Sequence, residues 1–178
     1  PGNIYLAKKR IANAGANRSM AAYLENPQAE RDQYAENTPT EMTLLKFVDH
    51  SGAIGALNWY ALHPTAMNFY NRLVSGDHKG YASWRMEQQR GNRYTEENGF
   101  VAAFAQADAG DVTPNTNLDN TGPGETDVET TKFVIKHLAS MAAPKKEEEP
   151  VKTLLDSHVV IKQGSDNKLI VENSLQEH

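Results

Sequence analysis

Two strand-like runs joined by a short turn constrain the fold of this sequence more than any other feature. The runs extend from Thr40 to Val48 and from Ala53 to His63, and the residues between them include the stretch DHSG, which is typical of a tight turn. Apolar and β-branched runs flanking such a turn predict a β-hairpin. The chain therefore contains at least one antiparallel strand pair.

Helix-like and strand-like segments alternate along the rest of the chain. Strands are expected around Ile4 and Leu6, in the apolar run GFVAAFAQ from Gly99, which suits a fully buried strand, and between Asp156 and Val171 around the turn QGSDN. Residues 20–36 predict one or two short helices around Pro27, because proline lacks the N–H that a helix interior needs. This alternation predicts an α/β fold with a mixed β-sheet and flanking helices.

Two longer helices are expected to cover the core. Residues 80–90 suit a helix whose Ala82, Trp84 and Met86 are able to face it. From about Glu125 a second helix has apolar or half-apolar residues close to a 3.6-residue period: Val128, Phe133, Val134, His137, Leu138 and Met141.

The composition limits the classes of function. The chain has 178 residues and a net charge of −5, with its 18 basic residues scattered among 23 acidic ones, which argues against a nucleic-acid partner. The absence of cysteine excludes disulfides and cysteine-ligated metals. No apolar run approaches the roughly 20 residues of a membrane helix. Because the sequence opens on PGNIYLAKKRI without methionine or a signal peptide, we expect an interior piece of a longer polypeptide.

The expected organisation has three parts. Residues 1–143 form the main part of one domain, the charged, proline-bounded stretch PKKEEEP at 144–150 is a linker or loop, and residues 151–178 continue the same domain.

His63 is the histidine most suited to chemistry. It closes the second hairpin strand and precedes Pro64, and residues that follow buried strands are where α/β proteins place their sites. Its imidazole is a candidate metal ligand, with a hydrogen-bonded core histidine as the alternative. Arg18, in the stretch NRS after a loop, is a candidate clamp for an oxyanion or a carboxylate, with an ordinary surface arginine as the alternative.

The long polar stretch DAGDVTPNTNLDNTGPGET at 108–126 allows three interpretations. A phosphate cradle is disfavoured, because the stretch lacks the GxxxxGK[ST] pattern and no lysine lies between Lys79 and Lys132. A hydroxyl nucleophile and a plain surface connection both stay open. Local sequence does not distinguish the four candidate hydroxyls, which belong to Thr113, Thr116, Thr121 and Thr126.

Several collinear blocks together resemble the neutral ceramidase family. They are GNIYLAKKRI, NRSMAAYLENPQAERDQY, EMTLLKF, NWYALHPTAMN, NRLVSGDHKGYASW, FVAAFAQADAGDVTPNTN and the TGP turn, with LDSHVVI as a more diverged continuation. The resemblance implies part of a larger zinc-hydrolase catalytic domain that cleaves the N-acyl bond of ceramide to sphingosine and a fatty acid. It also implies secreted or extracytoplasmic placement, ceramide or a related N-acyl sphingolipid as substrate, and access to a membrane surface through the remaining segments of the parent chain.

Residue roles follow from the resemblance where the motifs match. His63 in NWYALHP corresponds to a zinc ligand of the family, and Arg18 in NRS to an arginine of the catalytic pocket. In GDVTPN, Thr113 replaces the usual serine, and Asp111 and Asn115 are expected to bind substrate. The family's loop serine, a nucleophile or a substrate contact, has no serine counterpart between Gly91 and Leu138. Thr121 takes its place if the alignment follows the Gly-Pro step, and Thr126, otherwise a substrate-binding residue, is the alternative.

The resemblance also predicts that the site is divided. The family's His-x-His-Ser-Gly motif is expected before this piece and its glutamate and tyrosine ligands after it, so the piece holds one of about four zinc ligands and is inactive by itself. Two other interpretations stay open. One is a catalytically impaired, ceramidase-like protein with a binding or structural role, and the other is a different amide or ester substrate on the same scaffold.

Overall fold

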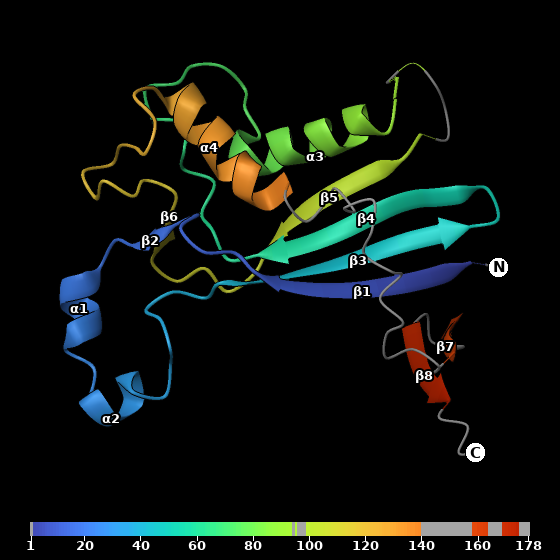
Figure 1. Ribbon diagram of the computed structural model, residues 1–178, viewed down its shortest axis with the longest axis horizontal. Coiled ribbons are helices and arrows are strands. Elements are labelled where there is room, and N and C mark those ends of the chain that lie inside the picture. The colour runs from blue at the N-terminus through green and yellow to red at the C-terminus, as the bar shows by residue number, and fades with distance from the viewer. Residues whose placement is uncertain (1, 94, 96–98, 140–157, 164–168, 175–178) are drawn as a thin grey trace. The chain divides into compact units, whose positions relative to one another are not determined.

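The computed structural model describes residues 2–93, 95, 99–139, 158–163 and 169–174. The chain divides into two compact units, Pro1–Ala143 and Pro144–His178, and each is described by itself. The candidate functional residues all belong to the first unit, which Figure 1 shows with its strands and helices labelled.

The first unit is built on a four-stranded mixed sheet. In sheet order the strands are β1 (Asn3–Arg10), β3 (Glu41–Asp49), β4 (Gly52–Tyr60) and β5 (Val101–Gln106). The β1–β3 and β3–β4 pairs are antiparallel, whereas β4 and β5 are parallel. The predicted hairpin and the predicted mixed sheet are therefore confirmed, and the hairpin register shifts between Phe47 and Val48.

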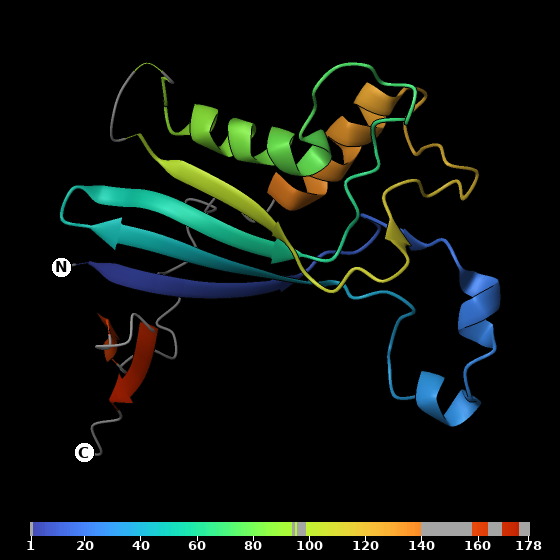
Figure 2. The same cartoon turned by 180° about the vertical axis from the view of Figure 1, so that it is seen from behind.

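Two helices cover one face of this sheet, as both views show (Figures 1 and 2). Helix α3 (Asp77–Gln89) lies between β4 and β5 in the chain, as a parallel strand pair requires of its crossover connection. Helix α4 (Asp127–Ala139) packs against α3. The core between these helices and the sheet contains Met42, Tyr60, Leu62, Val134 and Leu138, each at most 2% exposed.

The remaining elements of the unit are short. Helices α1 (Met20–Leu24) and α2 (Gln28–Arg31) flank Pro27, which confirms the expected interruption. Strand β2 (Ala16–Asn17) pairs antiparallel with β6 (Val112–Thr113) and forms a two-residue ladder separate from the main sheet. This small ladder joins two segments almost a hundred residues apart in the sequence.

Three burial predictions were wrong. Strand β5 is not fully buried: Val101 is 63% exposed and Ala102 is 6% exposed, because successive side chains of a strand point to opposite faces and the two helices cover one face of the sheet. Trp84 is 43% exposed and stacks on Tyr81. It lies two residues from both Ala82 and Met86, and residues two apart in a helix do not share a face, so Trp84 is not on their buried face. Val128 is half exposed, because it lies in the first turn of α4, before the buried stretch that begins at Thr130. Met141 lies outside the described residues.

The second unit contains an antiparallel strand pair. Strand β7 (His158–Gln163) pairs with β8 (Leu169–Ser174), which confirms the strands expected between Asp156 and Val171. Most of the turn between them and the stretch 144–150 lie outside the described residues. No helix in the described ranges has the length and apolar character needed to cross a membrane.

Candidate active site

His63 lies three residues beyond the end of β4, not in the strand as the sequence predicted. The connecting residues Ala61 and Leu62 are buried in the core, so the chain leaves the sheet in a fixed direction. The backbone N–H of His63 donates a hydrogen bond to the carbonyl oxygen of Val112 at 3.2 Å. Its side chain is half-buried beside the small β2–β6 ladder.

A second hydrogen bond fixes the imidazole of His63. Its Nδ1 lies 3.0 Å from the same Val112 oxygen. Because a carbonyl oxygen only accepts hydrogen bonds, Nδ1 is the donor, and in the neutral imidazole Nε2 then carries the lone pair. Histidines that bind metals are held in this way, with the second ring nitrogen donating to a carbonyl or carboxylate.

Arg18 and Asp111 face each other across the end of the β2–β6 ladder. The backbone N–H of Arg18 donates to the Asp111 carbonyl at 3.0 Å, and Arg18 Nε lies 3.9 Å from Asp111 Oδ1. Both side chains are 50% exposed, so the ion pair contributes little stability and leaves the guanidinium accessible. The structure thus brings Arg18, His63 and Asp111 to the two-residue ladder.

Close backbone packing holds this arrangement together. A Cβ atom at Gly15 would lie 2.6 Å from Leu62 Cδ1 and 3.0 Å from the Thr113 carbonyl oxygen. Only glycine fits there without displacing the residue before His63 or the β6 strand.

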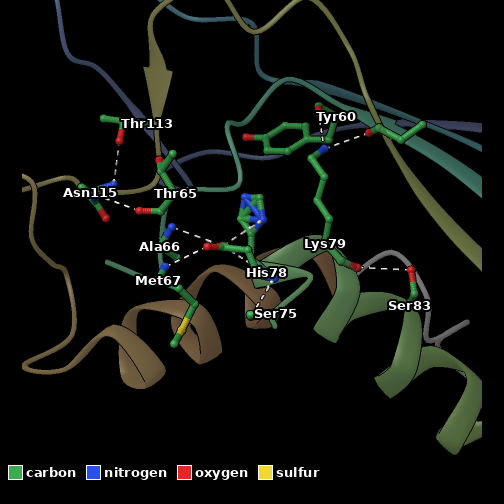
Figure 3. A network of polar contacts seen from close by, with 12 residues as sticks. Tyr60, Thr65, Ala66, Met67, Ser75, His78, Lys79, Ser83, Thr113 and Asn115 are labelled. Atoms are coloured by element: carbon green, nitrogen blue, oxygen red, sulfur yellow. Dashed lines mark hydrogen bonds and ion pairs between the residues drawn. The ribbon is translucent and has the colours of Figure 1, made fainter. Parts of the chain in front are cut away.

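Thr113 and Asn115 belong to the same region and are both buried. Thr113 Oγ1 accepts the backbone N–H of Asn115 at 3.2 Å. Asn115 Nδ2 donates to the carbonyl of Thr65, two residues after His63, at 3.0 Å (Figure 3). Asn115 therefore links the polar loop to the segment that carries His63.

Thr121 lies in a more exposed part of the loop. Its hydroxyl donates to Asp119 Oδ1 and accepts from Asn117 Nδ2 at 3.2 Å. The hydrogen bonds from the Thr121 side chain and backbone hold the pKa of Asp119 below its usual value. Within the described residues, the hydrogen bonds of this hydroxyl stay inside its own loop and do not reach His63 or Arg18.

Thr126 caps helix α4. Its Oγ1 accepts the backbone N–H of Glu129 at 3.2 Å, and Glu129 Oε2 accepts the backbone N–H of Thr126 at 3.1 Å. This reciprocal pair is a capping box. The exposed Thr126 hydroxyl thus has a structural partner at the start of the helix.

The sequence interpretation missed a polar cluster at the first turn of α3. Asp77, His78 and Lys79 are consecutive, and the first two are 7% and 0% exposed. Figure 3 shows His78 and Lys79 on the ribbon of α3, with the Lys79 side chain reaching toward Tyr60 at the end of β4.

Each member of this cluster has a distinct environment. Burial lowers the pKa of His78 to about 4, against the opposing effect of Asp77, and neither ring nitrogen has a hydrogen-bond partner. The His78 Nδ1 lies 3.7 Å from Asp77 Oδ1, beyond hydrogen-bond distance. Burial also lowers the pKa of Lys79 to about 8.

A sequence feature marked this cluster. Three ionisable residues in a row lie between glycines in SGDHKGYA. Asp77 adopts a φ of 53°, in the left-handed region that aspartate tolerates better than most residues, and this turns its carboxylate back toward the chain before the helix.

The fit of these residues to a metal ion is limited to one ligand. His63 has the tautomer that a zinc ligand needs, with Nε2 carrying a lone pair. No three histidine, cysteine, aspartate or glutamate side chains of the described ranges lie close enough together to hold a metal. The described part of the chain thus supplies one fitting ligand and not a complete site.

Comparison with known proteins identifies similar chains. The family model described as neutral/alkaline non-lysosomal ceramidase, N-terminal, matches residues 1–152. The neutral ceramidase of Drosophila pseudoobscura pseudoobscura is 44% identical over 116 residues, which cover 64% of this chain and 16% of the relative. The neutral ceramidase of Pseudomonas aeruginosa is 37% identical over 136 residues, which cover 75% of this chain and 19% of the relative.

Solved structures give the same result. The crystal structure of the Pseudomonas aeruginosa neutral ceramidase matches 80% of this chain and 22% of that chain, with a TM-score of 0.65 and 35% identity. A structure of a ceramidase complexed with C2 matches the same shares with a TM-score of 0.67 and 34% identity. The present chain therefore spans about a fifth of the length of these relatives.

Proposed function

Because this chain belongs to the neutral/alkaline non-lysosomal ceramidase family, we propose that it forms part of a zinc-dependent amide hydrolase that cleaves the N-acyl bond of ceramide. The products are sphingosine and a fatty acid. The whole activity belongs to the longer protein, since the chain spans about a fifth of its relatives and carries one fitting zinc ligand.

The hydrogen bond from His63 Nδ1 to the Val112 carbonyl is the observation that best supports this proposal. When Nδ1 donates to a carbonyl oxygen, Nε2 of the neutral ring is the nitrogen left for a metal. Here the backbone N–H and the ring of the same residue donate to one oxygen, so the direction of Nε2 is set by the β6 strand. Zinc bound there supplies a Lewis acid that polarises the amide carbonyl and lowers the pKa of a bound water.

Arg18 is proposed to stabilise the negative charge that develops on the amide oxygen. Its guanidinium carries its charge at every relevant pH and presents several N–H donors. Asp111 holds Arg18 loosely, at 3.9 Å and half exposed, so the remaining donors face solvent. An accessible guanidinium can stabilise an oxyanion through its charge and its N–H donors.

The loop residues are proposed to line the substrate site. Asp111 and Asn115 contact the polar part of the substrate, and Thr121 supplies a hydroxyl for contact or, as the lesser alternative, for attack. The hydrogen bond between Asn115 and Thr65 supports this arrangement, since it ties the loop to the segment after His63. Thr126 is the alternative hydroxyl, although it also caps α4.

A lipid substrate reached at a membrane surface is also part of the proposal, as is a secreted or extracytoplasmic location. Phe69, Tyr70, Leu73 and Val74 are between 75% and 107% exposed, which is unusual for large apolar side chains in a single short segment. Leu73 also lines a hollow of about 340 Å³ that extends from Pro64 to Asp77, next to His63 in the chain. These features support contact with an apolar ligand near the proposed site.

One observation supports a second candidate, a catalytically impaired ceramidase-like protein with a binding or structural role. The Thr121 hydroxyl donates to the Asp119 carboxylate, whose pKa is lowered, so Asp119 is a weak base for activating it. The added methyl group of threonine also restricts its rotamers.

An assay of the complete protein separates the two candidates. Release of sphingosine from ceramide, measured by mass spectrometry and lost after zinc is removed with a chelator, is the result expected for the hydrolase. Ceramide binding without release of sphingosine would support the impaired protein instead.

A further inference from the structure

We propose that Asp77 and Lys79, from the first turn of α3, are positioning residues that hold the backbone on both sides of His63. The effect on zinc binding rests on the proposed function. The hydrogen bonds of Asp77 and Lys79 to this backbone, called the clamp below, concern this chain alone. Figure 3 shows Lys79 reaching Tyr60 at the end of β4, and it shows Ala66 and Met67, whose backbone N–H groups donate to Asp77, on the segment after His63.

Lys79 holds the segment before His63. Its Nζ donates to the carbonyl oxygens of Tyr60 at 2.9 Å and Ala105 at 2.8 Å. Tyr60 is the last residue of β4, and Ala105 is the last but one of β5. The lysine thus joins the ends of the two parallel strands from which the His63 segment and the loop to Val112 depart.

Asp77 holds the segment after His63. Its Oδ1 accepts the backbone N–H of Ala66 at 3.2 Å, and its Oδ2 accepts the backbone N–H of Met67 at 2.7 Å. The carboxylate is buried, so these charge-assisted hydrogen bonds are shielded from water. The next residue, Asn68, donates its N–H to Asp127 at the start of α4 at 2.8 Å, which extends the hold to the second helix.

His63 therefore lies between two anchors that come from one helical turn. The anchors act three residues before it, at Tyr60, and three to four residues after it, at Ala66 and Met67. Val112 then orients the ring itself. Movement of the first turn of α3 would therefore shift the backbone on both sides of His63 and change the direction of Nε2.

Lys79 continues to donate its two hydrogen bonds at a pH above its lowered pKa. A neutral amine still has two N–H bonds, one for each carbonyl. A purely space-filling residue at this position would not carry a charge into the interior, where charge is costly unless it is hydrogen-bonded. The backbone groups that they satisfy therefore explain the buried carboxylate of Asp77 and the half-buried amine of Lys79.

The test uses the complete protein with Lys79→Met, which keeps the length of the side chain but removes its donors, and Asp77→Asn, which keeps its shape but removes its charge. The controls are Lys132→Met and Asp108→Asn, which lie outside the clamp and make none of its hydrogen bonds. The rate of hydrogen exchange at the backbone amides of residues 61–68 measures how firmly the clamp holds this segment. Zinc affinity, measured by competition with a chromogenic chelator, reads its consequence for His63.

We expect faster exchange at 61–68 and roughly 10- to 100-fold weaker zinc binding in both variants, with the controls unchanged, as for residues that orient a metal ligand. Lys79→Arg, which keeps the donors and the charge, should retain more zinc affinity than Lys79→Met. Zinc affinity equal to that of the wild type in folded Lys79→Met and Asp77→Asn would overturn the proposal. If Lys79→Met does not fold, the zinc affinity of Asp77→Asn alone tests the proposal.

Failure of the proposed hydrolase function can be distinguished from failure of the positioning role. If the unmodified protein binds zinc through His63 but releases no sphingosine, the hydrolase assignment is wrong and the positioning role stands. If it binds no zinc, the ring ¹⁵N shifts of His63 replace zinc affinity as the measurement. Loss of the Nδ1–H tautomer in the two variants would then support positioning, and unchanged shifts would contradict it.

Discussion

The imidazole Nδ1 of His63 donates to the carbonyl oxygen of Val112 over 3.0 Å, and the backbone N–H of His63 donates to the same oxygen over 3.2 Å. One acceptor on β6 therefore fixes both the backbone and the ring of the candidate metal ligand. Because β6 also pairs with β2, the position of Arg18 depends on the same two-residue ladder.

Replacing Gly15 tests how tightly that ladder is packed. A Cβ in Gly15→Ala would lie 2.6 Å from Leu62 Cδ1, so we expect the free energy of unfolding to fall by about 1–3 kcal/mol. Gly80→Ala is the control, because its Cβ would meet no atom within 4 Å and alanine favours a helix by about 0.5–1 kcal/mol. Urea denaturation of both variants measures the difference. If Gly15→Ala had the same free energy of unfolding as the wild type, the ladder would accommodate the added methyl group without loss of stability.

The buried His78 predicts a sensitivity to acid. Its pKa is about 4 in the folded protein, against 6.5 for an unperturbed histidine side chain. Between these pH values the unfolded chain binds a proton that the folded chain does not, so stability falls as the pH falls from about 6.5 to 4. This loss should be smaller in His78→Leu, which removes the ionisable group.

Urea denaturation at about pH 7.0, 5.5 and 4.5, with exposed His50→Leu as the control, measures this contribution. A pH dependence that is the same in His78→Leu and in the wild type would show that His78 does not cause it.

Thr126 has two candidate roles that different measurements separate. Thr126→Ala should lower the free energy of unfolding by about 1 kcal/mol, because it removes the cap of α4, and Thr126→Ser should largely restore it. A rise in KM in folded Thr126→Ala would reveal the substrate contact that the family resemblance implies. Loss of stability with an unchanged KM would limit Thr126 to capping.

Thr121 is the hydroxyl that replaces the family serine under the favoured alignment. Thr121→Ser should keep or raise the rate of ceramide hydrolysis, because it keeps the hydroxyl and removes the crowding methyl group. Thr121→Val keeps the shape and removes the hydroxyl, so it should lower kcat. If both variants hydrolyse ceramide like the wild type while Thr126→Ala does not, the alignment on the Gly-Pro step is wrong.

The sequence predicted those elements whose determinants are local. The DHSG turn between two apolar runs specified the β3–β4 hairpin, and Pro27 separated α1 from α2. Errors arose where burial depends on neighbours. Val101 is exposed because its side chain points to the face of the sheet opposite to that of the buried Ala102, and Trp84 because a helix does not present residues two apart on one face.

The candidate site was predicted only in part, for a related reason. His63 and Arg18 were identified as candidates, but their proximity depends on the two-residue pairing of β2 with β6, which carries no periodic sequence pattern. The polar role of Asp77 and Lys79 depends on backbone groups at Ala66, Met67, Tyr60 and Ala105, and a sequence does not show which backbone groups lack partners.

The zinc content of His63→Ala in the complete protein tests the central claim most directly. We predict that His63→Ala loses its zinc, measured by elemental analysis, together with hydrolysis of a fluorogenic ceramide. His50→Ala, in the exposed hairpin turn, should retain both. Folded His63→Ala with the zinc content of the wild type would contradict the claim that this histidine is a zinc ligand.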